Sequence, residues 1–140
     1  MNTITETQDQ IIEDFSLMDD WDDKYAYLIE LGKKITPLSQ EYKTEKNIIK
    51  GCQSKVWIIS KLEDGKIFFQ ADSDALIVKG LIALLLKTYS GYSPEEIIST
   101  EPYFIDKIGM QQHLSMTRSN GLASMVKQIK LDALAFNTKN

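Results

Sequence analysis

Hydrophobic positions at helical spacing predict two amphipathic helices at the start of the chain. The first set is Ile11, Ile12, Phe15 and Met18, and the second is Tyr25, Leu28, Ile29 and Gly32. Thr5 and Gln8 fit a capping box at the start of the first helix. Asp20 is the expected N-cap of the second helix, which should end before Pro37. Two short amphipathic helices in series predict an antiparallel helical hairpin.

Two strands are expected next, at residues 56–62 and 67–71, because both segments are rich in β-branched and aromatic residues. Asp64-Gly65 between them suits a two-residue type I′ turn, and this turn sets the register of the hairpin. The expected core face pairs Leu62 with Ile67, Ser60 with Phe69 and Ile58 with Ala71. The opposite face pairs Lys61 with Phe68, Ile59 with Gln70 and Trp57 with Asp72. The open end of the hairpin then carries Cys52-Gln53-Ser54 and Asp72-Ser73-Asp74.

A third helix is expected from Ala75 to about Tyr89, capped by Ser73 or Asp74. Apolar residues occupy most of its circumference, which predicts a central helix covered on nearly every side. Gly80 lies in its middle. A glycine costs a helix about 1 kcal/mol relative to alanine, so its presence indicates a closely packed neighbour.

The remaining segments are predicted from weaker patterns. Residues 36–50 have no clear period and are expected to form a long loop that leads to Cys52 and admits a short strand at Ile48-Ile49. Pro94 should occupy the first position of a short helix. Residues 101–112 are expected to be irregular, with one helical turn around Phe104-Ile105. A final helix is predicted over about 118–136, where apolar residues again recur at helical spacing.

This order of elements predicts an α+β fold in which helices pack a small antiparallel sheet. A parallel dinucleotide-binding fold is disfavoured, because the sequence has no glycine-rich phosphate loop. With 140 residues, the chain is expected to form one domain over residues 1–140.

Composition narrows the class of protein. The net charge of −4 argues against a nucleic-acid partner, because phosphate binding normally needs a basic face. No segment approaches the ~18 unbroken apolar residues of a membrane span. The N-terminus lacks the pattern of a secretion signal, and there is one cysteine. We therefore expect a cytoplasmic protein with no membrane partner and no disulfide within the chain.

The one cysteine, Cys52, lies between a glycine and a predicted strand in the segment Gly51-Cys52-Gln53-Ser54-Lys55-Val56-Trp57. Gly51 allows backbone angles that can present the neighbouring thiol outward. The charges of Lys50 and Lys55 should favour the thiolate. Cys52 is therefore a candidate nucleophile. The alternative is a buried, inert cysteine, since free cysteines are among the most buried residues.

Metal, cofactor and hydrolase sites fit the residue types of this chain less well than a single nucleophilic cysteine does. One cysteine and one histidine cannot supply a zinc or iron–sulfur site from a single chain, and a pyridoxal enzyme needs a larger scaffold. No cofactor is therefore expected. A cysteine hydrolase or transferase would use Cys52 as nucleophile, His113 as base and Asp106 or Asp74 to orient the base. An interaction module in which Cys52 is incidental is the other alternative.

Four blocks of the sequence, in order, resemble the SufE family of sulfur acceptors. They are Trp21 with Lys24-Tyr25-x-Tyr27-Leu28-Ile29-Glu30-Leu31-Gly32, the segment Gly51–Trp57, Asp72-Ser73-Asp74-Ala75-x-Ile77-Val78-Lys79-Gly80-Leu81, and Gln112-His113-Leu114-Ser115 with Arg118-Ser119-x-Gly121-Leu122. The resemblance implies a small antiparallel sheet packed by helices, similar to the scaffold protein IscU but without its cluster ligands.

The resemblance also implies a role in iron–sulfur cluster assembly. Cys52 would take persulfide sulfur from a SufS-like, pyridoxal-phosphate-dependent cysteine desulfurase, stimulate that enzyme, and deliver the sulfur to the SufBCD scaffold complex. The chain would then be a sulfur-transfer accessory protein rather than an independent enzyme. A CsdE-like acceptor for another desulfurase is the alternative within the resemblance, although Gln53-Ser54 looks closer to SufE. The chain could also form a weak homodimer.

The matching blocks nominate residues for partner binding or loop support. They are Gly51, Gln53, Ser54, Asp74, His113 and Arg118. Each of three has a structural alternative: Asp74 as a helix cap, His113 as a turn residue and Arg118 as a surface ion-pair partner. A carrier must shield its persulfide from reductants and oxidants, so we expect free Cys52 to lie against apolar side chains and its loop to swing outward on docking.

Overall fold

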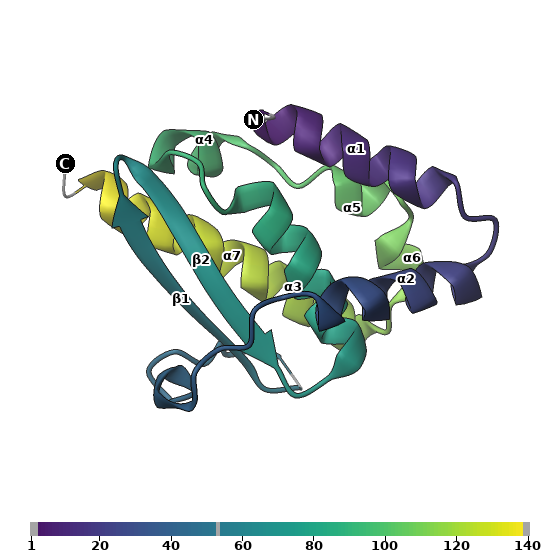
Figure 1. The fold of residues 1–140 in the computed structure, drawn as a ribbon, viewed down its shortest axis with the longest axis horizontal. Coiled ribbons are helices and arrows are strands. Elements are labelled where there is room, and N and C mark those ends of the chain that lie inside the picture. The colour runs from purple at the N-terminus through teal and green to yellow at the C-terminus, as the bar shows by residue number, and fades with distance from the viewer. Residues whose placement is uncertain (1–2, 53, 139–140) are drawn as a thin grey trace.

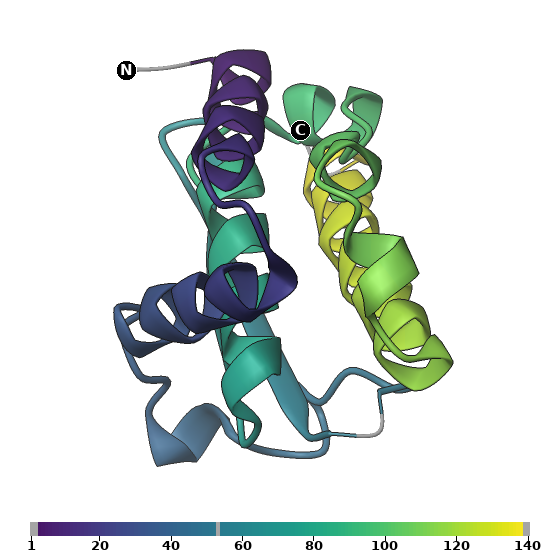
Figure 2. The same ribbon diagram turned by 90° about the vertical axis from the view of Figure 1, so that its right-hand side faces the viewer.

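The computed structural model describes residues 3–52 and 54–138, and it has the α+β architecture that the sequence predicts. A two-stranded antiparallel sheet packs on a long helix, α3 (Leu76–Tyr89), and a second long helix, α7 (Met116–Thr138), lies beside α3 behind the hairpin (Figures 1 and 2). The other helices cover the outer side of these two. None of the helices in the described part of the chain combines the length and the apolar character that crossing a membrane requires.

The hairpin forms in the predicted register. β1 (Val56–Glu63) pairs with β2 (Lys66–Ser73), and all six predicted cross-strand pairs are confirmed. Asp64 and Gly65 have φ angles of 52° and 78°, the left-handed conformation that a type I′ turn requires at both positions. The expected core face is buried at Ile58, Ile67, Phe69 and Ala71. The short strand considered at Ile48-Ile49 is a single bridge from Ile48 to Trp57.

The first two helices form, but not as the predicted hairpin. α1 (Ile4–Ser16) and α2 (Trp21–Lys33) both pack on α3, and α2 turns across α3 instead of running back along α1 (Figure 2). The predicted capping box at Thr5 and Gln8 is wrong, because Thr3 and Glu6 form it two residues earlier. The earlier start adds Ile4 to the helix, where it is buried in the core. Asp20 is confirmed as the N-cap of α2.

α3 is the central helix that its sequence predicts, and most residues of its middle and last turns are buried. Its predicted cap is wrong: Ala75 is the N-cap residue, Ser73 Oγ accepts the Ala75 N–H at 3.2 Å, and the Asp74 carboxylate is occupied elsewhere. A methyl group on Gly80 would enter the backbone of Leu28 in α2, which confirms the close neighbour expected at this glycine.

The C-terminal half follows the predicted order with shifted boundaries. α4 (Pro94–Ser99) begins at Pro94, as expected. Residues 101–112, predicted to hold one helical turn, contain α5 (Phe104–Lys107) and the start of α6 (Met110–His113). α7 begins at Met116, two residues before the predicted start, because Ser115 Oγ accepts the N–H of Arg118 at 3.2 Å and so caps the helix. A short 3₁₀ helix, η1 (Gln40–Tyr42), interrupts the long loop.

Candidate functional site

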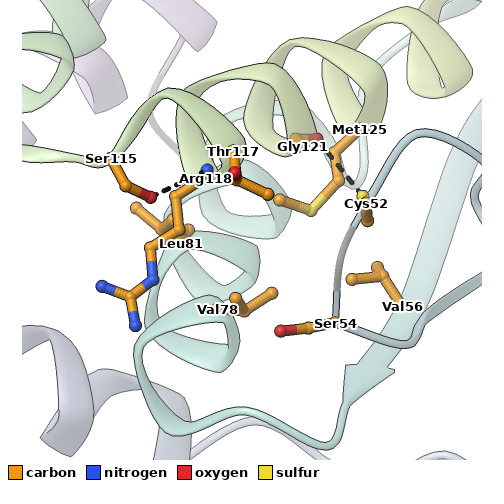
Figure 3. A pocket seen from close by; sticks show the side chains of 10 residues that line it. All are labelled: Cys52, Ser54, Val56, Val78, Leu81, Ser115, Thr117, Arg118, Gly121 and Met125. Atoms are coloured by element: carbon orange, nitrogen blue, oxygen red, sulfur yellow. Dashed lines mark hydrogen bonds between the residues drawn. The ribbon is translucent and has the colours of Figure 1, made fainter.

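Cys52 lies on the wall of a pocket of about 330 Å³ between its own loop, α3 and α7 (Figure 3). The loop and the start of β1 contribute Ser54 and Val56, and α3 contributes Val78 and Leu81. The first turns of α7 and the residue before them supply the rest of the lining: Ser115, Thr117, Arg118, Gly121 and Met125. The chain thus brings its one thiol into a concave surface that combines hydroxyl groups, aliphatic side chains and one cation.

The thiol of Cys52 is half-buried and lies against α7. Its Sγ donates a hydrogen bond to the Gly121 carbonyl oxygen at 3.6 Å (Figure 3). Burial raises the pKa of the Cys52 thiol above its ordinary value, because a thiolate loses solvation in this position. The expectation that Lys50 and Lys55 favour the thiolate is therefore wrong in the free protein. Both lysines are exposed, and burial alone sets the direction of the shift.

Two glycines allow the cysteine loop to sit on α7. Gly51 has φ 95°, and a Cβ there would lie 2.7 Å from Ser124 Oγ. Gly121 faces the thiol itself, where a Cβ would lie 3.3 Å from Cys52 Sγ. The loop therefore rests on the helix surface through positions that have no side chain.

Asp74 holds the other side of the cysteine loop. Its carboxylate Oδ1 accepts the N–H of Lys55 at 3.1 Å, and its own N–H donates to the Lys55 carbonyl oxygen at 3.4 Å. These bonds join the two chain segments at the open end of the hairpin, as the predicted register requires. Asp74 is thus a contact of the loop instead of the helix cap.

His113 lies outside the pocket. Its ring stacks on Trp21 with centroids 4.0 Å apart, and its carbonyl oxygen accepts a hydrogen bond from Tyr25 Oη. The Cys52 thiol has the Gly121 carbonyl as its hydrogen-bond partner among the described residues. The fold therefore does not assemble the Cys52–His113 pair of a cysteine hydrolase. The ring contact of Trp21 and the hydrogen bond of Tyr25 link α2 to the segment that leads into α7.

Of the other residues nominated from the sequence, two line the pocket and one lies outside the described residues. Ser54 and Arg118 line the pocket, and Gln53 lies outside the described residues. Sequence reasoning did not nominate Val78, Leu81, Gly121 or Met125. The helical spacing of Arg118, Gly121 and Met125 indicates a shared face, but the pattern alone does not say that the face meets Cys52. Over residues 3–52 and 54–138, no three His, Cys, Asp or Glu side chains are grouped so that they could hold a metal ion.

The burial of the thiol predicts how its reactivity depends on pH. Alkylation of Cys52 by iodoacetamide should rise with pH around a midpoint that lies higher in the folded protein than in the chain unfolded by denaturant, since burial raises the pKa. Lys50→Gln and Lys55→Gln should leave the midpoint unchanged. A lower midpoint in the folded protein would contradict this assignment.

Comparison with known proteins places this geometry in a family. The family model "SufE: Fe-S metabolism associated domain" matches residues 9–133. The chain is 47% identical over 130 residues to an uncharacterized SufE-like protein of Rhizobium etli, covering 89% of this chain and 88% of that protein. It is 42% identical over 130 residues to an uncharacterized SufE-like protein of Rhizobium meliloti, covering 89% and 93%.

A solved structure supports the fold independently. The solution structure of a hypothetical protein from Thermus thermophilus superposes with a TM-score of 0.78 at 22% identity, covering 94% of this chain and 96% of that one. The family match spans the pocket, the cysteine loop, all of α3 and α7 as far as residue 133. The chain therefore belongs to the SufE family, whose domain is associated with Fe–S metabolism.

Proposed function

We propose that this chain is a sulfur acceptor and carrier that takes persulfide sulfur from a SufS-like cysteine desulfurase onto Cys52. It then delivers the sulfur to the SufBCD scaffold for iron–sulfur cluster assembly and stimulates the desulfurase by removing its product. The proposal treats the chain as one SufE-like domain acting in the cytoplasm, and as an accessory protein whose only covalent intermediate is a cysteine persulfide.

The observation that carries the proposal is the position of Cys52. The one sulfur nucleophile of a SufE-family chain lies at the wall of an open pocket, on a loop that rests on α7 through glycines. A structural cysteine would be expected deep in the core with no adjoining space. Here the thiol is half-buried beside enough space to accommodate an added sulfur atom.

The transfer is a thiol–disulfide exchange. The Cys52 thiolate attacks the outer sulfur of the desulfurase persulfide, a new bond forms between Sγ and that sulfur, and the S–S bond to the desulfurase cysteine breaks. The desulfurase thiolate is the leaving group, and the product is a persulfide on Cys52. No external oxidant or reductant is consumed.

The raised pKa explains how the loop would control this reaction. In the free protein burial keeps most of the thiol protonated, and therefore slow to react with adventitious electrophiles. A thiol is a weak hydrogen-bond donor, so the bond to Gly121 holds the side chain inward only weakly. Docking on the desulfurase would swing the loop outward, restore solvation or charge partners to the sulfur, and lower its pKa. Return to α7 would then shelter the persulfide.

The direct test is sulfur loading followed by intact-mass spectrometry. Incubation with a SufS-like desulfurase, pyridoxal phosphate and cysteine should raise the mass of the chain by one sulfur atom or a whole multiple of it, and a thiol reductant should reverse the change. Cys52→Ser should abolish the adduct entirely, because no other cysteine is present. Glu63→Ala is the control, since it changes an exposed side chain outside the pocket and should load sulfur as the unmodified chain does.

Other outcomes separate the alternatives. A protein that takes sulfur from another cysteine desulfurase and not from a SufS-like one would be the CsdE-like acceptor. Co-purification with a partner equally well after Cys52→Ser, with no sulfur adduct on the unmodified chain, would identify an interaction module and contradict the carrier role.

A further inference from the structure

Arg118 is an unpaired cation at the pocket that holds Cys52. Of the residues that line this pocket in the described part of the chain, it is the charged one. No carboxylate within residues 3–52 and 54–138 lies within ion-pair distance of its guanidinium, although the protein carries 20 acidic residues. The surface ion pair considered from the sequence is therefore not formed. A guanidinium left open at a concave surface is suited to an anion from outside the chain.

Arg118 lies one helical turn before the residue of α7 that contacts the thiol. Arg118, Gly121 and Met125 share one face of α7, and Cys52 Sγ rests against Gly121. Gly121 follows Arg118 by three positions, so the Cα atoms of the two residues are roughly 4.5 Å apart along the helix axis. Figure 3 shows the two groups on opposite sides of the pocket, with the guanidinium extending away from the sulfur. Arg118 is exposed and its side chain is long, so the guanidinium can meet an anionic group that lies within a few bonds of the reacting atom.

The rest of the lining fits a small amphipathic molecule. The hydroxyl-bearing residues Ser54, Ser115 and Thr117 offer partners for polar groups, and Val78, Leu81 and Met125 offer an apolar surface. The volume of about 330 Å³ lies at the small end of ligand pockets, which suits a molecule of amino-acid size instead of a large cofactor.

We propose that this pocket binds low-molecular-weight thiols and persulfides that carry a carboxylate, cysteine persulfide being the simplest, with the carboxylate on Arg118. The inference rests on the proposed role of Cys52 as a sulfur acceptor and adds a second source of sulfur that needs no protein partner. Arg118 is the residue that sets the preference for an anionic donor.

The reaction balances without a further reagent. The Cys52 thiolate attacks the outer sulfur of R–S–S–H, the new bond joins Sγ to that sulfur, and the S–S bond of the donor breaks. The donor leaves as R–S⁻, takes a proton from solvent, and becomes the free thiol; for cysteine persulfide this product is cysteine. The carboxylate keeps its charge on Arg118 throughout.

The first experiment compares two alkylating agents of nearly equal size on the full chain. Iodoacetate carries a carboxylate and iodoacetamide is neutral, so the ratio of their rates at Cys52 measures the preference for an anion. Arg118→Gln should lower this ratio by roughly three- to fivefold, the effect of losing one exposed charge pair, and should leave the iodoacetamide rate unchanged. Arg118→Lys should keep most of the ratio.

Lys55→Gln is the matched control, because it removes an exposed charge close to Cys52 in sequence and outside the pocket lining. Its ratio should equal that of the unmodified chain. If the ratio of the iodoacetate rate to the iodoacetamide rate is the same in Arg118→Gln as in the unmodified chain, the proposal is overturned. An equal fall in both rates would also overturn it, since that would report an altered loop and not a lost anion site.

The second experiment loads sulfur without a desulfurase. Cysteine persulfide should add one sulfur atom to Cys52 faster than the neutral persulfide of 2-mercaptoethanol, and Arg118→Gln should remove this difference. If the desulfurase loads Cys52 but the two small persulfides react alike, the pocket inference fails and the carrier role stands. If neither route loads Cys52 while iodoacetate selectivity persists, the carrier role fails and the anion site stands.

Discussion

Replacing Asp72 by alanine should lower the free energy of unfolding by about 3 kcal/mol, the cost of removing one partner from a buried ion pair. Asp72 is 2% exposed at the end of β2. Its carboxylate accepts N–H groups from Leu38 and Ser73, at 3.2 and 2.8 Å, and pairs with Lys43 and Lys79, at 3.3 and 3.4 Å. Alanine would leave the buried N–H of Leu38 unsatisfied and two partly buried lysines without their anion.

The same side chain predicts a dependence of stability on pH. Burial by itself would raise the pKa of Asp72, but the N–H groups of Ser73 and Leu38 and the charges of Lys43 and Lys79 together hold it below its ordinary value of 3.8. A group whose folded pKa is depressed stabilises the fold above its unfolded pKa. This contribution should therefore be full above about pH 5 and should be lost as the pH falls below 3.8 through the lower folded pKa.

Urea denaturation at pH 7 and at several acid pH values would measure both effects. Glu63→Ala is the matched control: it also removes a carboxylate paired with a lysine, but this pair is exposed and should contribute no more than about 0.5 kcal/mol. The account of Asp72 fails if Asp72→Ala and Glu63→Ala cost the same, or if the acid dependence of stability survives in Asp72→Ala unaltered.

Gly80→Ala should destabilise the protein by about 2 kcal/mol, although alanine is the better helix former. The added methyl group would enter the backbone of Leu28, because α2 and α3 cross with their main chains in contact. On the other helix, a Cβ at Gly32 would lie 2.8 Å from the Gly80 nitrogen, so the contact is close from both sides. Backbone atoms cannot move aside as a side chain can, and the two helices would have to separate.

Gly121→Ala provides the matched comparison for Gly80. Gly121 is also a buried helical glycine, but the nearest atom to an added Cβ is the terminal sulfur of Cys52, at 3.3 Å. That side chain can shift by a few tenths of an ångström, and the gain in helix propensity of about 1 kcal/mol should offset the contact. Thermal or urea unfolding of the two variants should therefore differ clearly. Equal stability of Gly80→Ala and the unmodified protein would contradict the backbone contact between α2 and α3.

The local elements were predictable because their signals are local. The Asp64-Gly65 turn fixed every cross-strand pair of the hairpin before its structure was known, since a two-residue turn leaves one register. The apolar circumference of α3 predicted its central place, and Gly80 predicted its close neighbour. The capping box failed for the opposite reason: Thr3 with Glu6 and Thr5 with Gln8 fit the same pattern, and the burial of Ile4 favours the first.

The arrangement of those elements in space was harder to predict from the sequence. The proximity of α1 and α2 along the chain suggested a hairpin, but both helices instead bury their apolar residues in one core around α3. Likewise, the types of Cys52, His113 and Asp74 permit a hydrolase, whereas the fold stacks His113 on Trp21 and turns Asp74 to the Lys55 backbone. The residue types limit which reactions are possible, and the positions of the side chains in the fold decide which of these reactions the site can support.

The sequence by itself determined the hairpin and its register, the central helix, the single nucleophilic sulfur and, through four ordered blocks, the family. The tertiary structure decided that α7 lies against the cysteine loop, that Gly121 receives the thiol and that Arg118 shares its pocket. It also decided that burial, and not the neighbouring lysines, governs the pKa of Cys52. The physical reason is that turns and helical faces are set by residues a few positions apart, whereas solvation of the sulfur depends on a helix that begins more than 60 residues further along the chain.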